Sequence, residues 1–219
     1  MPAALDIGAL RSELERAAVA ADVEPMTAYL RHQFALLGVK TPARRACSKP
    51  FIAQLRRTPV DDAVEAAIAL RREPEREFHY VASDLLRAVA ARLEPAHLES
   101  VAWMVTTDSW WDTVDAIASP SVGVMAQRHT DVADAMDEWI DHDDIWLARV
   151  AILHQLRYGD ATDRDRLFAY AERRADDTEC FIRKATYARV EPEAVRSFVE
   201  ARRSRCSTLT VNEALKHLA

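Results

Sequence analysis

Apolar residues recur with the period of an α-helix along nearly the whole chain, and this pattern constrains the fold more than any other feature. In residues 24–37, for example, one helical stripe contains Met26, Tyr29, Leu30, Phe34 and Leu37. Only 4 glycines and 9 prolines occur among 219 residues, whereas β-hairpins draw heavily on glycine. The sequence therefore predicts an all-α fold without strands.

Helix-start residues, glycines and prolines mark the expected helix ends. Gly38 is expected to stop one helix, and Thr41 with Pro42 to cap and open the next. Pro50 is expected to bend or interrupt that helix, and Pro120 to end or kink a later one. The expected helices are residues 7–21, 24–37, 41 onward, 60–71, 74–93, 95–106, 109 onward, 120–128, 131–140, 144–158, 163–174, 180–190, 192–202 and 209–217.

These helices are short, fall roughly into pairs and are joined by a few residues each. Pairs that bury a face against the next pair are typical of an α-solenoid, which we expect to form one domain over residues 1–219. Periodicity alone leaves a compact helical bundle open. A curved solenoid would have a long concave face, which suits a rod such as duplex DNA.

Charge is distributed unevenly along this chain of net charge -6. Residues 25–60 contain no acidic residue, and residues 181–206 contain seven basic residues against three acidic ones. Such basic patches can bind the phosphates of a nucleic acid, and they are equally well explained as solvated helix faces. Arg44 and Arg45 follow Pro42 at a helix start, a setting that suits a backbone phosphate.

Other classes of protein are disfavoured by composition. No apolar stretch is long enough to span a bilayer, and the N-terminus lacks the pattern of a secretion signal. The three cysteines, Cys47, Cys180 and Cys206, are widely spaced and suit a reducing cytoplasm. The histidines show no metal-ligand spacing. We therefore expect a cytoplasmic protein without metal or membrane association.

The candidate site is the stretch Asp108-Ser-Trp-Trp-Asp-Thr-Val-Asp115. Ser109 and Asp112 have the spacing of a helix start. Trp111 and Asp115 then share one helix face, while Trp110, Thr113, Val114 and Ile117 form a more apolar one. An aromatic ring beside a carboxylate suits a cation or a sugar acquiring positive charge. The alternative is that both tryptophans pack in the core, as most large apolar side chains do.

The chain resembles the AlkD-like DNA alkylation repair family of HEAT-like-repeat DNA glycosylases. The resemblance covers most of the chain, and its most specific parts are Ser109-Trp-Trp-Asp-Thr-Val-Asp115 and Ile145-Trp-Leu-Ala-Arg149. It is also carried by Glu24–Tyr29, Phe34–Pro42, Pro74–Phe78, Phe181–Ala185 and Glu213–His217. It implies a solenoid of HEAT-like antiparallel helix pairs with a concave basic face.

The resemblance also implies an activity and a site. The family removes cationic alkylated purines, such as 7-methylguanine or 3-methyladenine, from double-stranded DNA with the base left stacked. Carried over to this chain, Trp111 and Asp115 are the catalytic residues, and Arg149 lies on the DNA-facing surface. Asp115 would stabilise the oxocarbenium-like sugar and orient the water, and no cofactor is implied.

One segment departs from the family pattern. In the family, the block matching Phe181–Ala185 is followed by about two further helical turns that carry a second active-site tryptophan and an arginine. Here the chain runs directly into Thr186–Val190. Arg183 and Lys184, on the shortened helix, are candidates for phosphate contacts or for an ordinary surface role.

The sequence therefore leaves three functions open. The first is a monomeric alkylpurine DNA glycosylase acting in base excision repair. The second is a family member that binds DNA but has lost excision with the missing turns. The third is a helical-repeat scaffold for proteins, in which Trp111 would be a binding anchor.

Overall fold

The structure is a computed structural model that describes residues 6–174 together with residues 197, 200, 201, 208 and 211. Apart from one isolated bridge between Ala35 and Glu75, every regular element in this part of the chain is helical. This confirms the predicted all-α, helical-repeat fold. The chain falls into two compact units, residues 1–100 and 101–219, which we describe in turn. The helices expected over residues 180–217 lie almost entirely outside the described residues.

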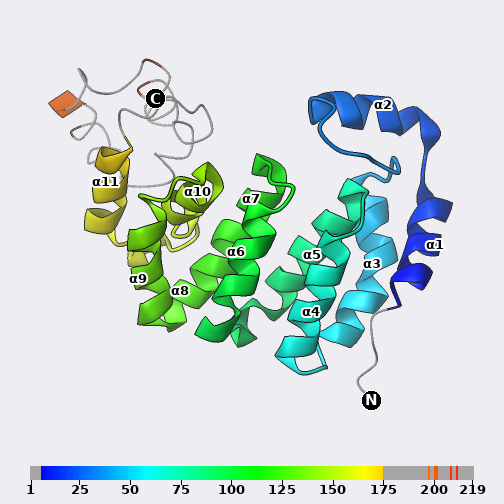
Figure 1. The fold of residues 1–219 in the computed structure, drawn as a ribbon, viewed down its shortest axis with the longest axis horizontal. Helices are drawn as coiled ribbons and strands as arrows, with labels where there is room; N and C mark the ends of the chain where they lie inside the picture. The colour runs from blue at the N-terminus through cyan, green and yellow to red at the C-terminus, as the bar shows by residue number, and fades with distance from the viewer. Residues whose placement is uncertain (1–5, 175–196, 198–199, 202–207, 209–210, 212–219) are drawn as a thin grey trace. The chain divides into compact units, whose positions relative to one another are not determined.

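The first unit is built from five α-helices, joined by short connections except for the longer loop between α2 and α3 (Figure 1). Its closest packing is between α4 and α5, and α3 packs against both α1 and α5. Leucines from α1, α4 and α5 are completely or almost completely buried in its core, among them Leu10, Leu70 and Leu85. The helices are α1 (Ile7–Ala17), α2 (Ala20–Tyr29), α3 (Thr41–Leu55), α4 (Val60–Arg71) and α5 (Arg76–Val89).

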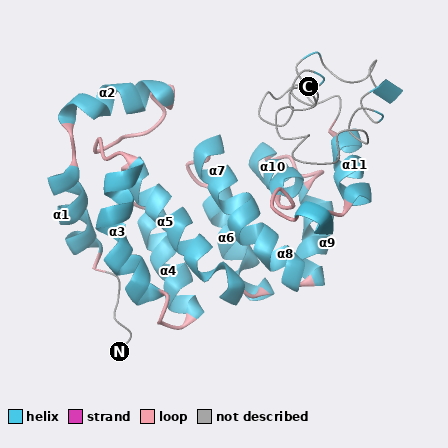
Figure 2. Cartoon of the chain, turned by 180° about the vertical axis from the view of Figure 1, so that it is seen from behind, coloured by secondary structure: helices cyan, strands magenta, loops and turns pink. Residues whose placement is uncertain are grey.

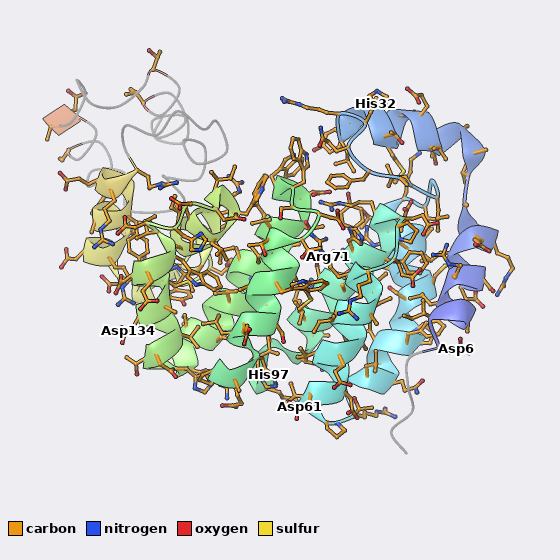
Figure 3. All side chains as sticks on the ribbon, viewed as in Figure 1. Asp6, His32, Asp61, Arg71, His97 and Asp134 are labelled. Carbon is orange, nitrogen blue, oxygen red and sulfur yellow. The ribbon has the colours of Figure 1, made fainter. Side chains whose placement is uncertain are left out.

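Two 3₁₀ turns, η1 (Ala90–Arg92) and η2 (Pro95–His97), follow α5 and lead into α6 (Leu98–Thr106). His97 connects them to the start of α4, since its Nε2 lies 2.8 Å from Oδ1 of Asp61 (Figure 3). The Nδ1 of the same ring accepts from the Glu94 amide at 2.8 Å and completes a capping box around η2. This pair therefore fixes the end of the first unit.

Residues 24–37 depart most from the sequence prediction. The helix α2 ends at Tyr29, whose side chain is 68% exposed, and contributes no buried residue. Both views of the chain show α2 lying apart from α3, α4 and α5 (Figures 1 and 2). Gly38 is in a loop with φ of 87° rather than at a helix stop, and a Cβ there would lie 2.6 Å from the Val19 carbonyl oxygen.

A tertiary contact explains this departure. The buried Glu77 carboxylate accepts hydrogen bonds from the amides of Leu37, Gly38 and Val39 at 3.0–3.1 Å. The Arg76 guanidinium also lies 3.8 Å from the centre of the Phe34 ring. These contacts hold the segment in a non-helical path, so the local helical pattern is overridden.

Arg11 attaches α1 to the turn between α4 and α5. It donates to Glu75 at 2.8 and 2.9 Å and to Glu73 at 2.5 Å. These hydrogen bonds, that to Glu75 first, raise the pKa of Arg11, and the Arg11 guanidinium lowers the pKa of Glu75. The guanidinium also lies 4.6 Å from the centre of the Phe78 ring.

Other predicted boundaries agree or shift by a few residues: the helix expected at residues 7–21 ends at Ala17, and that expected at residues 144–158 ends at Leu153. The helix expected at residues 60–71 is α4. Pro42 lies in the first turn of α3 as expected, although Lys40 rather than Thr41 is the N-cap residue. Pro50 does not interrupt α3, which runs on to Leu55. Because α3 is packed against α1 and α5, the missing hydrogen bond at this proline does not end it.

The second unit contains most of α6 and the helices α7 to α11, with α10 packed against α7, α9 and α11. Between α7 and α8, the chain forms a buried π-helical segment, η3, in which Pro120 lies. Among the described residues, none of the helices has the length and apolar composition that a membrane span requires. The elements are α7 (Trp111–Ile117), η3 (Ala118–Gly123), α8 (Val124–Arg128), α9 (Thr130–Trp139), α10 (Ile145–Leu153), η4 (Gly159–Ala161) and α11 (Arg164–Arg173).

The π-helical segment packs very closely on the end of α10. A Cβ on Gly123 would lie 2.2 Å from the His154 carbonyl oxygen. Tyr158 donates its hydroxyl to the Gly123 carbonyl at 2.6 Å, and burial raises the pKa of Tyr158 to about 12. Burial also lowers the pKa of His154 to about 4, although its Nδ1 is 2.6 Å from the Ala151 carbonyl oxygen.

Candidate active site

The helix α7 presents Trp111 and Asp115 from successive turns of one face. Both side chains are partly exposed, whereas Thr113, Val114 and Ile117 on the other face are buried. This is the division of faces that the sequence predicts. The helix therefore anchors itself with small and aliphatic side chains and leaves an indole and a carboxylate accessible.

The start of α7 differs from the expectation. The helix begins at Trp111, and Trp110 is its N-cap residue in an extended conformation. Ser109 does not cap it, because its hydroxyl donates to the Val105 carbonyl at 2.5 Å, at the end of α6. The preceding residue, Asp108, has a φ of 44° and lies in the connection between the two helices.

Arg149 holds the Asp115 carboxylate from the neighbouring helix α10. Its Nε and Nη2 donate to Oδ1 and Oδ2 of Asp115, each at 2.7 Å, in a bidentate pair. The Arg149 side chain is only 9% exposed, whereas that of Asp115 is 36% exposed. The arginine expected to face DNA thus lies behind the carboxylate and fixes its orientation.

Two further tryptophans lie at the same ends of α7 and α10. The rings of Trp110 and Trp146 are 6.0 Å apart and tilted by 51°. The two side chains therefore pack against each other, although both residues remain partly exposed. Trp146 lies one turn before Arg149, as Trp111 lies one turn before Asp115.

This arrangement suits the stabilisation of positive charge. The Asp115 carboxylate has a fixed orientation and an accessible edge, and it shares a helix face with the Trp111 ring. Within the described residues, no group of three or more His, Cys, Asp or Glu side chains could hold a metal ion. The chemistry that these side chains themselves offer is electrostatic stabilisation and orientation of a water molecule.

The structure places the other predicted DNA-binding residues differently from one another. The Arg44 guanidinium is buried rather than presented at the surface, because it pairs with Asp84 at 3.3 Å and lies over Tyr80. Burial lowers the pKa of Arg44. Arg45 is exposed, whereas Arg183 and Lys184 lie outside the described residues.

Sequence reasoning missed two residues here: Asp84, which lies beside both Arg44 and Arg45, and Arg87, which pairs with Asp84. Their i, i+3 spacing on α5 indicates a local pair, and the structure shows it at 2.9 Å. Nothing in the sequence signals that the same carboxylate also meets Arg44, which is 40 positions away.

Comparisons with known proteins give a consistent result. A family model described as "DNA alkylation repair enzyme" matches residues 10–218. The fold is similar to a solved structure described as a predicted DNA alkylation repair enzyme from Enterococcus faecalis. The two share 25% identity and a TM-score of 0.78, over 92% of this chain and 97% of the other. A search of curated proteins gave no match.

Proposed function

Because the chain belongs to the DNA alkylation repair enzyme family, we propose that it is a DNA glycosylase for cationic N-alkylated purines in duplex DNA. The substrates would be bases such as 7-methylguanine or 3-methyladenine. The observation that carries the proposal is the bidentate Asp115–Arg149 pair, with the carboxylate partly exposed on the helix face of Trp111. We expect the enzyme to act as a cytoplasmic monomer without a cofactor.

The positive charge of the substrate makes its base a good leaving group. When the N-glycosidic bond breaks, its electron pair goes to the base, which leaves as a neutral purine. The positive charge then remains on the sugar as an oxocarbenium-like ion. A carboxylate held near this charge favours the transition state over the ground state, in which the sugar is neutral.

Asp115 is the group that would supply this stabilisation. Its two oxygens are held by Arg149, so the side chain loses little further freedom when the charged sugar forms. The same carboxylate can orient a water molecule, whose oxygen bonds to C1′ and whose proton passes to the carboxylate or to solvent. The Trp111 ring would support the sugar through its negative face.

We further propose that excision occurs without base flipping. Enzymes that flip a base bind it in a pocket and read its edge. The groups at this site instead suit the sugar, where the positive charge develops. Specificity would then come from the lability of the alkylated base, since a neutral base leaves far less readily.

Release of 7-methylguanine from alkylated duplex DNA tests the proposal. The Asp115→Asn variant keeps the shape of the side chain but removes its charge, so we expect excision to fall about a hundredfold or more. Binding to duplex DNA should change little, because phosphate contacts dominate affinity. The matched control is Asp112→Asn, which removes the same charge from the same helix and should leave excision near the wild-type rate.

Two results would contradict the proposal in different ways. Excision that survives in Asp115→Asn would show that another group is catalytic. Wild-type protein that binds DNA in a salt-sensitive manner but releases no base would support the second function. That function is favoured by the direct continuation of Phe181–Ala185 into Thr186–Val190, where the family pattern has a further tryptophan.

A further inference from the structure

Three arginines meet one carboxylate where α3 and α5 pack together. Asp84 of α5 lies 3.3 Å from Nη2 of Arg44, 3.7 Å from Nε of Arg45 and 2.9 Å from Nη2 of Arg87. Three guanidinium groups share one carboxylate, so the cluster has an excess of two positive charges. Such an excess at a surface attracts an anion.

The three arginines are not equivalent. The Arg44 side chain is 8% exposed, and its guanidinium lies 4.6 Å from the centre of the Tyr80 ring. Its Nη1 is 3.5 Å from Thr41 Oγ1, and its Nε has no hydrogen-bond partner among the described residues. Arg44 is therefore a buried charge that needs Asp84, and it cannot serve an external ligand at the same time.

The other two arginines carry the excess charge at the surface. The side chains of Arg45 and Arg87 are 55% and 47% exposed, although both approach Asp84. Asp84 holds them from one side and leaves other N–H donors directed elsewhere, since a guanidinium has five. Two planar guanidinium groups that approach one carboxylate are well suited to the oxygens of a phosphate.

The start of α3 adds to the positive electrostatic potential near these arginines. Its first turn contains no acidic residue, and its N-cap residue, Lys40, makes no side-chain cap hydrogen bond. The unpaired amides at the start of a helix favour a nearby anion. Arg44 and Arg45 belong to the turn that follows these amides. The positive end of the helix and the arginine cluster would therefore attract the same anion.

We propose that Arg45 and Arg87 form a binding site for the phosphodiester backbone of duplex DNA, and that Asp84 holds these two arginines in place. The choice of duplex DNA as the ligand rests on the proposed function. The geometry separates two roles that the sequence does not: Arg44 is structural, and its neighbour Arg45 contacts the ligand. Arg87, on a different helix, becomes the second phosphate contact.

The test measures the affinity for unmodified duplex DNA as a function of salt, with 7-methylguanine release measured in parallel. Each phosphate contact contributes about 0.9 to the slope of log K against log salt. We expect Arg45→Gln and Arg87→Gln each to reduce the magnitude of the slope by about 1. The matched control is Arg57→Gln, which removes an exposed charge just beyond the other end of α3 and should leave the slope unchanged.

A fourth variant tests the division of roles. Arg44→Gln should lower the midpoint of thermal unfolding, because it leaves the Asp84 cluster without its buried partner, but it should keep the wild-type slope. Unchanged slopes in both Arg45→Gln and Arg87→Gln would overturn the inference even if excision is intact. If both variants reduce the slope but the wild-type protein releases no base, the inference is supported and the glycosylase proposal is overturned. Wild-type protein that does not bind DNA would overturn both.

Discussion

At the scale of single residues, Glu77 has the largest predicted effect on the fold of the first unit. Its buried carboxylate accepts three backbone hydrogen bonds from residues 37–39, two at Oε1 and one at Oε2. In Glu77→Gln, an amide NH₂ replaces one oxygen and faces a backbone N–H donor. We expect the free energy of unfolding to fall by about 3 kcal/mol, measured by urea denaturation.

The control for this prediction is Glu65→Gln on α4, where an exposed carboxylate is changed in the same way. Its effect should stay within about 0.5 kcal/mol, as is usual for surface substitutions. Equal losses in the two variants would show that net charge, rather than the hydrogen bonds of Glu77, is responsible.

The residue scale also shows what a sequence can predict of the site. Spacing alone places Trp111 and Asp115 on one face of α7, because neighbours four apart meet on any helix. The partner of Asp115 is 34 positions away and is set by the packing of α10 on α7. For the same reason, the burial of Arg44 against Asp84 could not be predicted from either helix alone.

At the scale of elements, helix interiors follow the sequence pattern more closely than helix ends. The predicted bounds of α4 are those observed, because its apolar face and its flanking residues agree. The segment after Tyr29 was predicted to be helical and is not, since its amides pair with Glu77 instead. Ser109 has the features of a cap but is used by the preceding helix.

The contact between η3 and the end of α10 leads to the next prediction. In Gly123→Ala, the new methyl group would meet a backbone oxygen at 2.2 Å, so the two elements must separate. We expect a loss of about 3 kcal/mol or more in the free energy of unfolding. Calorimetric or urea unfolding of the full chain measures this loss.

Gly159→Ala separates this packing effect from backbone strain. Gly159 has a φ of 56° but nothing within 4 Å of an added Cβ, so only strain of about 1 kcal/mol is expected. If the two variants lose the same stability, close packing at Gly123 is not the cause.

At the scale of the whole molecule, the buried His154 predicts how stability depends on pH. Burial lowers its pKa from the usual 6.5 to about 4, so the folded state resists protonation. The unfolded chain binds a proton below pH 6.5 and the folded chain only below about pH 4. Stability should therefore fall as the pH decreases between these values, by up to about 3 kcal/mol.

Urea unfolding at pH 7, 5.5 and 4.5 checks this prediction. His154→Gln removes the titrating group, and it should flatten the part of the pH dependence that lies between pH 4 and 6.5. If the slope over that window is the same in the wild type and in the variant, other groups govern acid unfolding. Glu75, whose pKa the Arg11 guanidinium lowers, acts in the same direction but below its usual pKa of 4.5.

The placement of α2 has a consequence for how the first unit opens. The helix contributes no buried side chain, yet its two ends are attached: the Val19 amide donates to the Gly38 carbonyl, and Leu30 is buried. The core made by α3, α4 and α5 therefore does not depend on it. The amides of α2 should exchange with solvent through a local opening that costs far less than global unfolding, so this helix can unfold and refold while the unit around it stays intact.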